Sequence, residues 1–304
     1  MAGRLAKLPP RWRLALRWPW PLRKPFERSV LVVAAFGGGL GDELMCTPIL
    51  REIKRRNPRI HLTFRTRYPE LFRDFPHADA ILPHDAPGAE TAVILTYADA
   101  VPPARPLVAL AGECAGLEVA ADELDPLWFE PLPAIRAALA AAPGPRIVVQ
   151  PLTSQWTPNK QWPLASWRTL IARLTERFSV IEVGTAPAFP GEDFGPRFSS
   201  WSGRTDHREL ASLLAQADVF VGPDSGGLHL ANVCRVPSVA IFGGYTAPEG
   251  VPYRRMESFY TPEPCAPCWL TSPCPYDIPC LRKIEPEAVF AAVCRLVEKE
   301  PAHA

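Results

Sequence analysis

The sequence lacks three features that would place the protein in a membrane, outside the cell or on a nucleic acid. No apolar run in its 304 residues approaches the roughly 20 residues that a transmembrane helix needs. No secretory signal is present, because arginines interrupt the apolar residues near the amino terminus and no small-residue cleavage site follows. The formal net charge is only +1, which argues against a general binder of polyanions such as nucleic acid. These absences predict a cytoplasmic protein.

The even charge balance conceals a basic segment at the amino terminus. Residues 1–28 carry eight Lys or Arg against Glu27 alone, with Trp12, Trp18 and Trp20 among them. Indole rings and cations together favour a peripheral contact with an anionic membrane, at the inner face of the cytoplasmic membrane. The prolines in this segment prevent one continuous amphipathic helix, so a disordered basic tail is an equal alternative.

Beyond residue 28, short apolar runs alternate with helical patterns, which is typical of an α/β protein. Pro143-Gly144-Pro145 interrupts the alternation just before a new strand pattern. We therefore predict two domains, 29–143 and 144–304. The expected strands are Ser29–Phe36, Ile60–Thr66, Ala80–Leu82, Ala92–Tyr97, Leu107–Leu110, Arg146–Gln150, Val180–Val183, Val219–Val221 and Val239–Phe242. Helices are expected after Gly39, over Ala134–Ala142, Leu164–Phe178 and Asp206–Gln216, and after Ser225.

The first strand pattern leads into a glycine-rich stretch, GGGLGDELMCTPILREIKRRNP, that opens a helix pattern. It is not a dinucleotide fingerprint, because Asp42 or Leu44 stands where the third glycine is needed. It is not a Walker loop either, since no Gly-Lys-Ser/Thr follows. What remains is a carboxylate, Asp42, beside Gly39 and Gly41 at the C-terminal edge of a sheet, where open α/β folds place ligands. The competing interpretation is an aspartate that only caps the helix.

A second polar step lies in the stretch Ala217–Gly244, where two apolar runs flank the letters DSGG. Asp224 and Ser225 are N-cap residue types, and Gly226 allows backbone N–H groups to approach an anion at the positive end of the helix. His229 comes one turn later, where it can donate a hydrogen bond to a phosphate or ribose oxygen. A capped core helix with a satisfied histidine explains the same residues equally well.

Four cysteines, Cys265, Cys268, Cys274 and Cys280, stand as C-x2-C-x5-C-x5-C in a proline-rich loop. Because the cytoplasm disfavours disulfides, the sharper interpretation is a structural zinc or iron site with four thiolate ligands. The wide second spacing keeps free thiols or a strained disulfide open as alternatives. The remaining cysteines are interpreted as buried small hydrophobes: Cys46, Cys114, Cys234 and Cys294.

Four stretches in order resemble the landmarks of the heptosyltransferase family, glycosyltransferase family 9. They are GLGDELMCTPILREIKRRNP, NKQWPLASW, GPDSGGLHLANVCRVPSVAIFGGYTAPEG and CAPCWLTSPCPYDIPCLRKIEPEAV. The order and approximate spacing match from about Val30 to Arg295, and four landmarks in register are far more specific than any one of them.

The resemblance implies a GT-B fold, with two facing Rossmann-like domains that contain parallel sheets. It implies an acceptor site on the N-terminal domain and a nucleotide-sugar site on the C-terminal domain. It also implies an inverting transfer, usually of heptose from ADP-heptose to a lipopolysaccharide core or related glycan, with no cofactor required for catalysis.

Matched residue by residue, the resemblance implies that Asp42 is the base. The implied donor-binding residues are Lys160, Asp224, Ser225, Gly226 and His229. Thr153 and Ser154, just after a strand pattern, are weaker candidates for phosphate contacts. A carboxylate can take the proton of the acceptor hydroxyl, and a lysine with helix amides can stabilise a departing diphosphate.

The sequence departs from the family pattern at two places. An acid that contacts the nucleotide is expected after the strand Val180–Val183, and both Glu182 and Glu192 are near it. The family's usual proline after the glycine that follows the strand Val239–Phe242 is replaced by Gly244-Tyr245, which puts the identity of the donor sugar in doubt. Two other functions stay open: transfer to a protein or other non-lipid acceptor, and a catalytically silent scaffold that binds a glycan or a partner protein.

Overall fold

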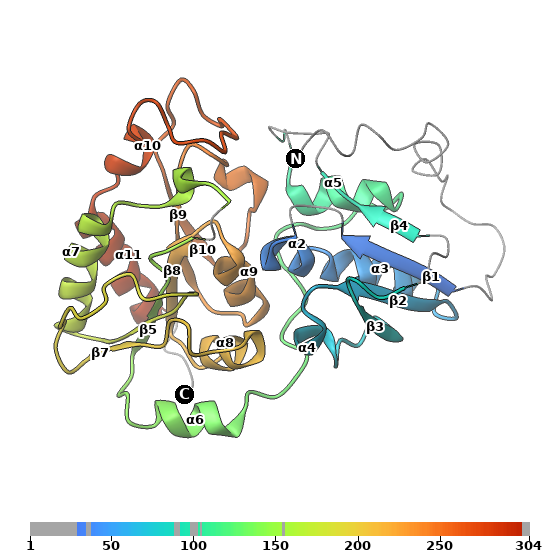
Figure 1. The fold of residues 1–304 in the computed structure, drawn as a ribbon, viewed down its shortest axis with the longest axis horizontal. Coiled ribbons are helices and arrows are strands. Elements are labelled where there is room, and N and C mark those ends of the chain that lie inside the picture. The colour runs from blue at the N-terminus through green and yellow to red at the C-terminus, as the bar shows by residue number, and fades with distance from the viewer. Residues whose placement is uncertain are drawn as a thin grey trace. The chain divides into compact units, whose positions relative to one another are not determined.

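The computed structural model describes residues 29–34, 38–87, 92–97, 103, 105–153 and 156–299. They form two compact units, each built on one parallel sheet (Figure 1). Unit 1 comprises the described residues up to Trp128 together with Glu249–Val251, and unit 2 comprises the remainder. The basic segment 1–28 lies outside the described residues, so its predicted membrane contact stays a prediction.

Unit 1 contains a four-stranded sheet with the order β3-β2-β1-β4. Its strands are β1 (Ser29–Ala34), β2 (His61–Thr66), β3 (Ala80–Pro83) and β4 (Ala92–Leu95). Its helices are α2 (Leu40–Leu44), α3 (Thr47–Arg56), α4 (Pro69–Phe72) and α5 (Leu107–Cys114). The apolar face of β2 buries Leu62 and Phe64, and Phe72 packs edge-to-face on Phe64 and stacks on Trp128.

Unit 2 contains a six-stranded sheet with the order β10-β9-β8-β5-β6-β7. Its strands are β5 (Arg146–Val149), β6 (Ser179–Glu182), β7 (Phe198–Ser200), β8 (Val219–Pro223), β9 (Ser238–Phe242) and β10 (Met256–Tyr260). Its α-helices are α6 (Pro133–Leu139), α7 (Leu164–Thr175), α8 (His207–Leu214), α9 (Gly226–Val233), α10 (Pro279–Arg282) and α11 (Pro286–Lys299). Short 3-10 turns are η2 (Pro158–Lys160) and η3 (Pro248–Gly250).

The central strands of unit 2 are mostly apolar, and they are buried along their whole length because both of their faces are covered. Every residue of β6, β8 and β9 is buried. One cluster joins Trp162 and Trp167, at the start of α7, to Leu170 and to Val289 and Val293 of α11. In both sheets all pairings are parallel, so the carboxyl ends of the strands meet at one edge of each sheet.

The predicted α/β class with parallel sheets is confirmed, but one predicted strand is wrong. Leu107–Leu110 begins the helix α5, with Pro106 at its N-cap. A short apolar run suits a buried strand and a buried helix equally, and the helix formers Leu and Ala decide for the helix here. The helix expected after Gly39 is divided into α2 and α3, and Pro48 lies in the first turn of α3, where its missing N–H is tolerated.

The two units meet along the chain between Trp128 and Phe129, whereas the sequence predicted a boundary at Pro143–Pro145. The intervening helix α6 belongs to unit 2 because it packs with α8. The N–H of Leu132 donates to Ser212 Oγ at 3.1 Å, and the Arg208 guanidinium lies over the Phe129 ring at 4.1 Å. Within the described part of the chain, no helix combines the length and apolarity needed to cross a membrane.

Candidate functional site

Asp42 lies in the first turn of α2, at the carboxyl edge of the unit 1 sheet. Its Oδ2 accepts the backbone N–H of Gly39 at 3.1 Å, and its Oδ1 accepts the hydroxyl of Tyr97 at 2.6 Å. Asp42 is only half-buried. Asp42 is therefore not the N-cap residue of α2, which is Gly39; from the first turn of the helix its carboxylate accepts the N–H of that N-cap residue. Each of its oxygens has a second lone pair, which is available to take a proton.

The glycine loop before Asp42 is shaped by close approach of another side chain. Gly38 has φ +80°, and a Cβ atom there would lie 2.4 Å from Nη1 of Arg67. Gly39 is the N-cap residue of α2, and Gly41 is buried within that helix. The hydroxyl of Tyr68 donates to the carbonyl of Gly38 at 3.1 Å. Glycine is thus required at 38 both for its backbone conformation and for the space that Arg67 occupies.

A buried acid next to Asp42 was not singled out from the sequence. Glu43 accepts hydrogen bonds from the hydroxyl of Thr66 and from the N–H of Arg67, and its Oε1 lies 3.6 Å from Nη1 of Arg67. Burial raises the pKa of Glu43, against the opposing effect of these donors. The adjacent letters D-E were the available signal. Glu43 ties the end of β2 to α2 and so holds the loop that presents Asp42.

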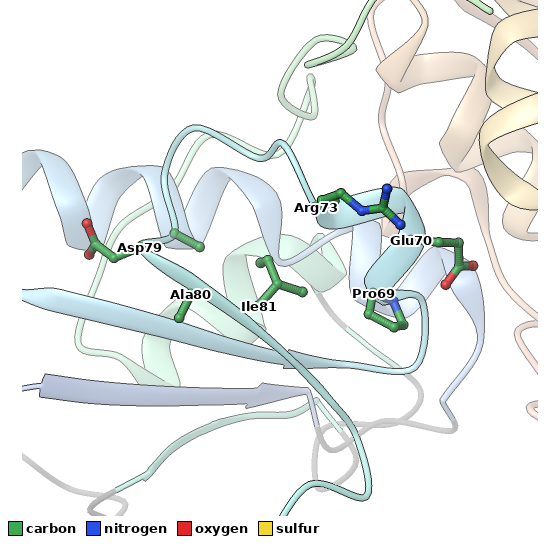
Figure 2. Close-up of a pocket in the computed structure, with 7 residues that line it drawn as sticks. Pro69, Glu70, Arg73, Asp79, Ala80 and Ile81 are labelled. Carbon is green, nitrogen blue, oxygen red and sulfur yellow. The ribbon is translucent and has the colours of Figure 1, made fainter.

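Two shallow hollows lie on unit 1. The larger, of about 430 Å³, is lined by Glu70 of α4, by Arg73 just after that helix, and by Asp79, Ala80 and Ile81 around the start of β3 (Figure 2). It lies at the amino end of β3, whereas parallel sheets bind ligands at the carboxyl end. The smaller, of about 280 Å³, lies at the carboxyl ends of β2 and β3. It is lined by Thr66, Arg67, Pro69, Pro83, His84 and Asp85.

In unit 2, the amino end of α9 follows β8 directly, as the sequence predicted. Ser225 is the N-cap residue, but its hydroxyl donates to Oε1 of Gln150 at 3.0 Å instead of capping the helix. A Cβ atom at Gly227 would lie 2.0 Å from that same Oε1, so the end of β5 packs directly against the first turn of α9. The first N–H groups of a helix have no partner within it, so the turn at Gly226 is suited to bind an anion.

Lys160 and Asp224, which are distant in sequence, form an ion pair beside this turn. Nζ of Lys160 lies 2.7 Å from Oδ2 of Asp224, and the two side chains are 21% and 8% exposed. The same ammonium lies over the ring of Tyr245, 4.8 Å from its centroid. The structure therefore brings together two residues of separate landmarks and adds Tyr245, the residue that replaces the family's usual proline.

The carboxylate of Asp224 stays ionised although it is buried. Burial alone would raise its pKa, but the Lys160 ammonium and the neighbouring His229 outweigh that effect and hold the pKa of Asp224 well below its usual range. Nε2 of His229 lies 3.6 Å from Oδ1 of Asp224, and Nδ1 lies 2.6 Å from the hydroxyl of Tyr253. Burial raises the pKa of the Tyr253 phenol well above its usual value. Tyr253 was not singled out from the sequence.

The turn that carries Lys160 is held by Asn159, a third residue that sequence reasoning missed. The Asn159 side chain is buried, and its Nδ2 donates to the carbonyls of Leu270 and Ser272, each at 2.7 Å. Its Oδ1 accepts the N–H of Cys274 at 3.0 Å. Both ends of the Asn159 amide are thus hydrogen-bonded to the cysteine-rich loop, residues 265–280. This loop therefore fixes the position of the neighbouring Lys160.

An aromatic group borders the Lys160 side chain. Tyr245 stacks obliquely on Trp269, with ring centroids 4.9 Å apart, and its hydroxyl accepts Nε1–H of Trp156 at 2.7 Å. Trp156 is 48% exposed. Among the described residues, Trp156 and Tyr276 are the large hydrophobic side chains that face solvent. The wall beside Lys160 is thus made of aromatic rings.

The two candidate acids near β6 have different surroundings. Glu182 ends β6 and is buried; its Oε1 accepts the N–H of Ala188 at 2.7 Å, and its Oε2 has no partner in the described part of the chain. Glu192 is exposed and forms a two-pronged ion pair with Arg168. Glu182 is therefore the acid with free hydrogen-bonding capacity at the carboxyl edge of the sheet. Thr153 is half-buried after β5, and Ser154 lies outside the described residues.

The predicted four-thiolate metal site is not formed. All cysteines of the described chain are free thiols, and no three His, Cys, Asp or Glu side chains among the described residues are grouped to hold a metal. Cys265 is exposed, whereas Cys280 is buried in α10 and its Sγ accepts the N–H of Gly244 at 3.1 Å. Cys265 and Cys280 thus lie in different environments. Hydrogen bonds from Asn159 and the backbone, and not a metal ion, hold this loop.

Comparison with known proteins agrees with these landmarks. A model of glycosyltransferase family 9 (heptosyltransferase) matches residues 108–271, more than half of the chain. Lipopolysaccharide heptosyltransferase 1 of Pseudomonas aeruginosa is 31% identical over 146 residues. That match covers 45% of this chain and 40% of the relative, so the chain spans less than half the length of the curated relative it matches.

Solved structures resemble the chain over most of its length. The ADP-heptose lipopolysaccharide heptosyltransferase II of Escherichia coli aligns with a TM-score of 0.66 and 16% identity, covering 90% of this chain and 100% of that one. The iron-containing dodecameric glycosyltransferase TibC from enterotoxigenic E. coli aligns with a TM-score of 0.68 and 18% identity, covering 90% and 80%. TibC has also been solved in complex with ADP-D-β-D-heptose. At these identities the agreement is one of fold, and the fold is that of GT-B glycosyltransferases.

Proposed function

Since the chain belongs to glycosyltransferase family 9, the heptosyltransferase family, we propose that it is an inverting glycosyltransferase that uses a nucleotide sugar, ADP-heptose, as donor. The observation that carries this proposal is the ion pair of Lys160 with Asp224 at the amino end of α9. A cation, helix amides and a buried carboxylate at the carboxyl edge of a parallel sheet suit a sugar attached to a diphosphate. The ADP-heptose complex of TibC supports the same donor.

On the donor side, Lys160 and the amides near Ser225 and Gly226 bind the diphosphate. When the bond from the anomeric carbon to the diphosphate breaks, negative charge grows on the leaving ADP, and these groups stabilise it. Asp224 holds the lysine in place in the unliganded chain. Glu182, through its unpaired oxygen, is the candidate acid for the ribose hydroxyls. Thr153 and Ser154 remain weaker candidates for contacts to phosphate.

On the acceptor side, Asp42 takes the proton of the attacking hydroxyl as its oxygen forms the new bond to the anomeric carbon. One attack on the opposite side from the leaving group inverts the configuration at that carbon. The hollow at the carboxyl ends of β2 and β3 presents Arg67 and His84 and is the candidate acceptor site. The Arg67 guanidinium there suits an anionic glycan such as a lipopolysaccharide core, although the Asp85 carboxylate lines the same hollow.

The test is a comparison of binding and turnover in Asp42→Asn. ADP-heptose binding, measured by calorimetry, should match the wild type, while release of ADP with a lipopolysaccharide-core acceptor should fall by about 100-fold or more. Glu209→Gln is the matched control, because Glu209 occupies the same position in the first turn of α8 and its Oε2 accepts the N–H of the N-cap residue, Asp206, at 2.9 Å. Normal turnover in Asp42→Asn would refute the mechanism.

A catalytically silent scaffold is the second candidate, and one observation favours it: both oxygens of Asp42 already accept hydrogen bonds within unit 1. Under this alternative the wild type binds a nucleotide sugar or glycan and shows no ADP release with any acceptor. Protein and other non-lipid acceptors belong in the same panel, since transfer to them is the alternative reaction.

We further propose that residues 1–28 contact anionic lipid, which would place the enzyme at the inner face of the cytoplasmic membrane. Its cations and tryptophans support this. A protein that lacks residues 1–28 should turn over soluble acceptor normally and co-sediment less with anionic vesicles at low salt. Equal co-sedimentation of both proteins would leave the segment without this role.

A further inference from the structure

Tyr253 is a buried phenol in contact with His229 that the proposed reaction does not use. Its hydroxyl lies 2.6 Å from Nδ1 of His229, and the two rings meet edge-to-face with centroids 5.7 Å apart. Both side chains are about 5% exposed. The contact involves the ring nitrogen remote from Asp224, so Tyr253 lies behind the histidine as seen from the ion pair with Lys160.

The charges around the histidine determine which atoms carry protons. Asp224 is ionised and can only accept, so a lone pair on Nε2 of His229 facing its Oδ1 at 3.6 Å would be repelled. In the neutral imidazole, Nε2 therefore carries the proton and Nδ1 is an acceptor. Because burial keeps the Tyr253 phenol protonated, its hydroxyl is the donor to Nδ1. The protons therefore point from Tyr253 toward His229 and from His229 toward Oδ1 of Asp224, while Lys160 contacts Oδ2 of the same carboxylate.

We propose that Tyr253 is a positioning residue that fixes His229 in the tautomer with its proton on Nε2, so that this N–H is available to the donor. The inference rests on the proposed donor site. The distance of 3.6 Å between Nε2 of His229 and Oδ1 of Asp224 exceeds that of an ordinary hydrogen bond, so Asp224 holds this N–H only weakly. It can therefore donate to a phosphate or sugar oxygen without rotation of the ring. The other tautomer would present a lone pair to the ligand.

A purely structural role for Tyr253 gives different expectations. In that case Tyr253→Phe would lower stability, since a buried ring nitrogen loses its partner, and would leave the tautomer and the donor affinity unchanged. The positioning role requires that Tyr253→Phe change both the tautomer of His229 and the affinity for the donor. His229→Gln separates the two roles further, because the glutamine amide supplies an N–H without a second tautomer.

The tautomer is measured on the full-length protein labelled with ¹⁵N-histidine, by long-range ¹H–¹⁵N correlation. The His229 signals are assigned by their loss in His229→Gln. We expect the wild type to show the Nε2–H form and Tyr253→Phe to show a mixture with the Nδ1–H form. A wild type in the Nδ1–H form, or a tautomer unchanged in Tyr253→Phe, would overturn the proposal.

Calorimetry with ADP-heptose supplies the second readout. Tyr253→Phe should weaken binding about three- to tenfold, and the same change made in the His229→Gln background should have no further effect. Tyr276→Phe, which alters a phenol 67% exposed on the cysteine-rich loop, should bind as the wild type does. An equal loss from Tyr253→Phe in both backgrounds would also overturn the proposal. If the wild type itself binds no ADP-heptose, the proposed function fails, and the tautomer measurement still decides the role of Tyr253.

Discussion

Replacing Lys160 by Met tests the energetics of the buried ion pair. Methionine keeps an apolar stem of similar length but leaves the 8% exposed carboxylate of Asp224 without its cation. Removing one partner of a buried pair costs about 3–5 kcal/mol. Lys160 is itself 21% exposed and His229 stays near Asp224, so we expect the lower end of this range, a loss of about 3 kcal/mol in the free energy of unfolding at pH 7.

The pH dependence of this loss has a definite sign. In the wild type the pKa of Asp224 is lowered, so its stabilising contribution is present above the unfolded value of about 3.9 and is lost as pH falls through the folded value. In Lys160→Met, burial dominates and raises the pKa, so ionised Asp224 opposes folding at neutral pH. The stability difference between wild type and variant should therefore be largest at pH 7 and shrink toward pH 4.

The assay is urea denaturation at both pH values, followed by tryptophan fluorescence. Lys160→Met/Asp224→Asn should recover much of the loss at pH 7, because no buried charge remains unpaired. Lys54→Met is the control: Lys54 is 22% exposed, but its partner Asp79 is 33% exposed, so its ion pair should be worth less than about 1 kcal/mol. A loss that is equal at pH 7 and pH 4, or a double variant as unstable as the single one, would refute the reasoning.

Two further substitutions test the donor side. Glu182→Gln should weaken binding of ADP about tenfold, with a smaller effect on a nucleotide that lacks ribose hydroxyls, whereas Glu192→Gln should leave calorimetric titrations of ADP unchanged. Gly227→Ala places a methyl group against Gln150 Oε1 and should lower the free energy of unfolding by about 1–3 kcal/mol in urea. Gly144→Ala, with no atom within 4 Å of the new Cβ, should change that free energy by less than about 0.5 kcal/mol; comparable losses in both would show that packing at Gly227 is not the cause.

Helices and strands were predictable from the sequence where their residue pattern favoured one type of secondary structure over the other. The apolar runs that became β5, β8 and β9 were recognisable as strands, since each is short, contains β-branched Val or Ile, and is flanked by glycine, proline or polar residues. The run at Leu107 was not predictable, because a helix buried on one side shows the same letters. The strand β7, which is short and half-exposed, has no hydrophobic pattern to detect.

For the candidate site, too, some features follow from the sequence and others follow only from the tertiary structure. The sequence by itself determined that Asp42, Lys160 and Asp224 belong to landmarks of one family, because their neighbours stand in a specific order. Only the tertiary structure decided that Lys160 is paired with Asp224, that the Tyr253 hydroxyl contacts Nδ1 of His229, and that the four cysteines are not grouped to hold a metal. The physical reason is that hydrogen bonds and ion pairs depend on distances between side chains from different strands and loops, and residue order along the chain does not contain those distances until the sheet has formed.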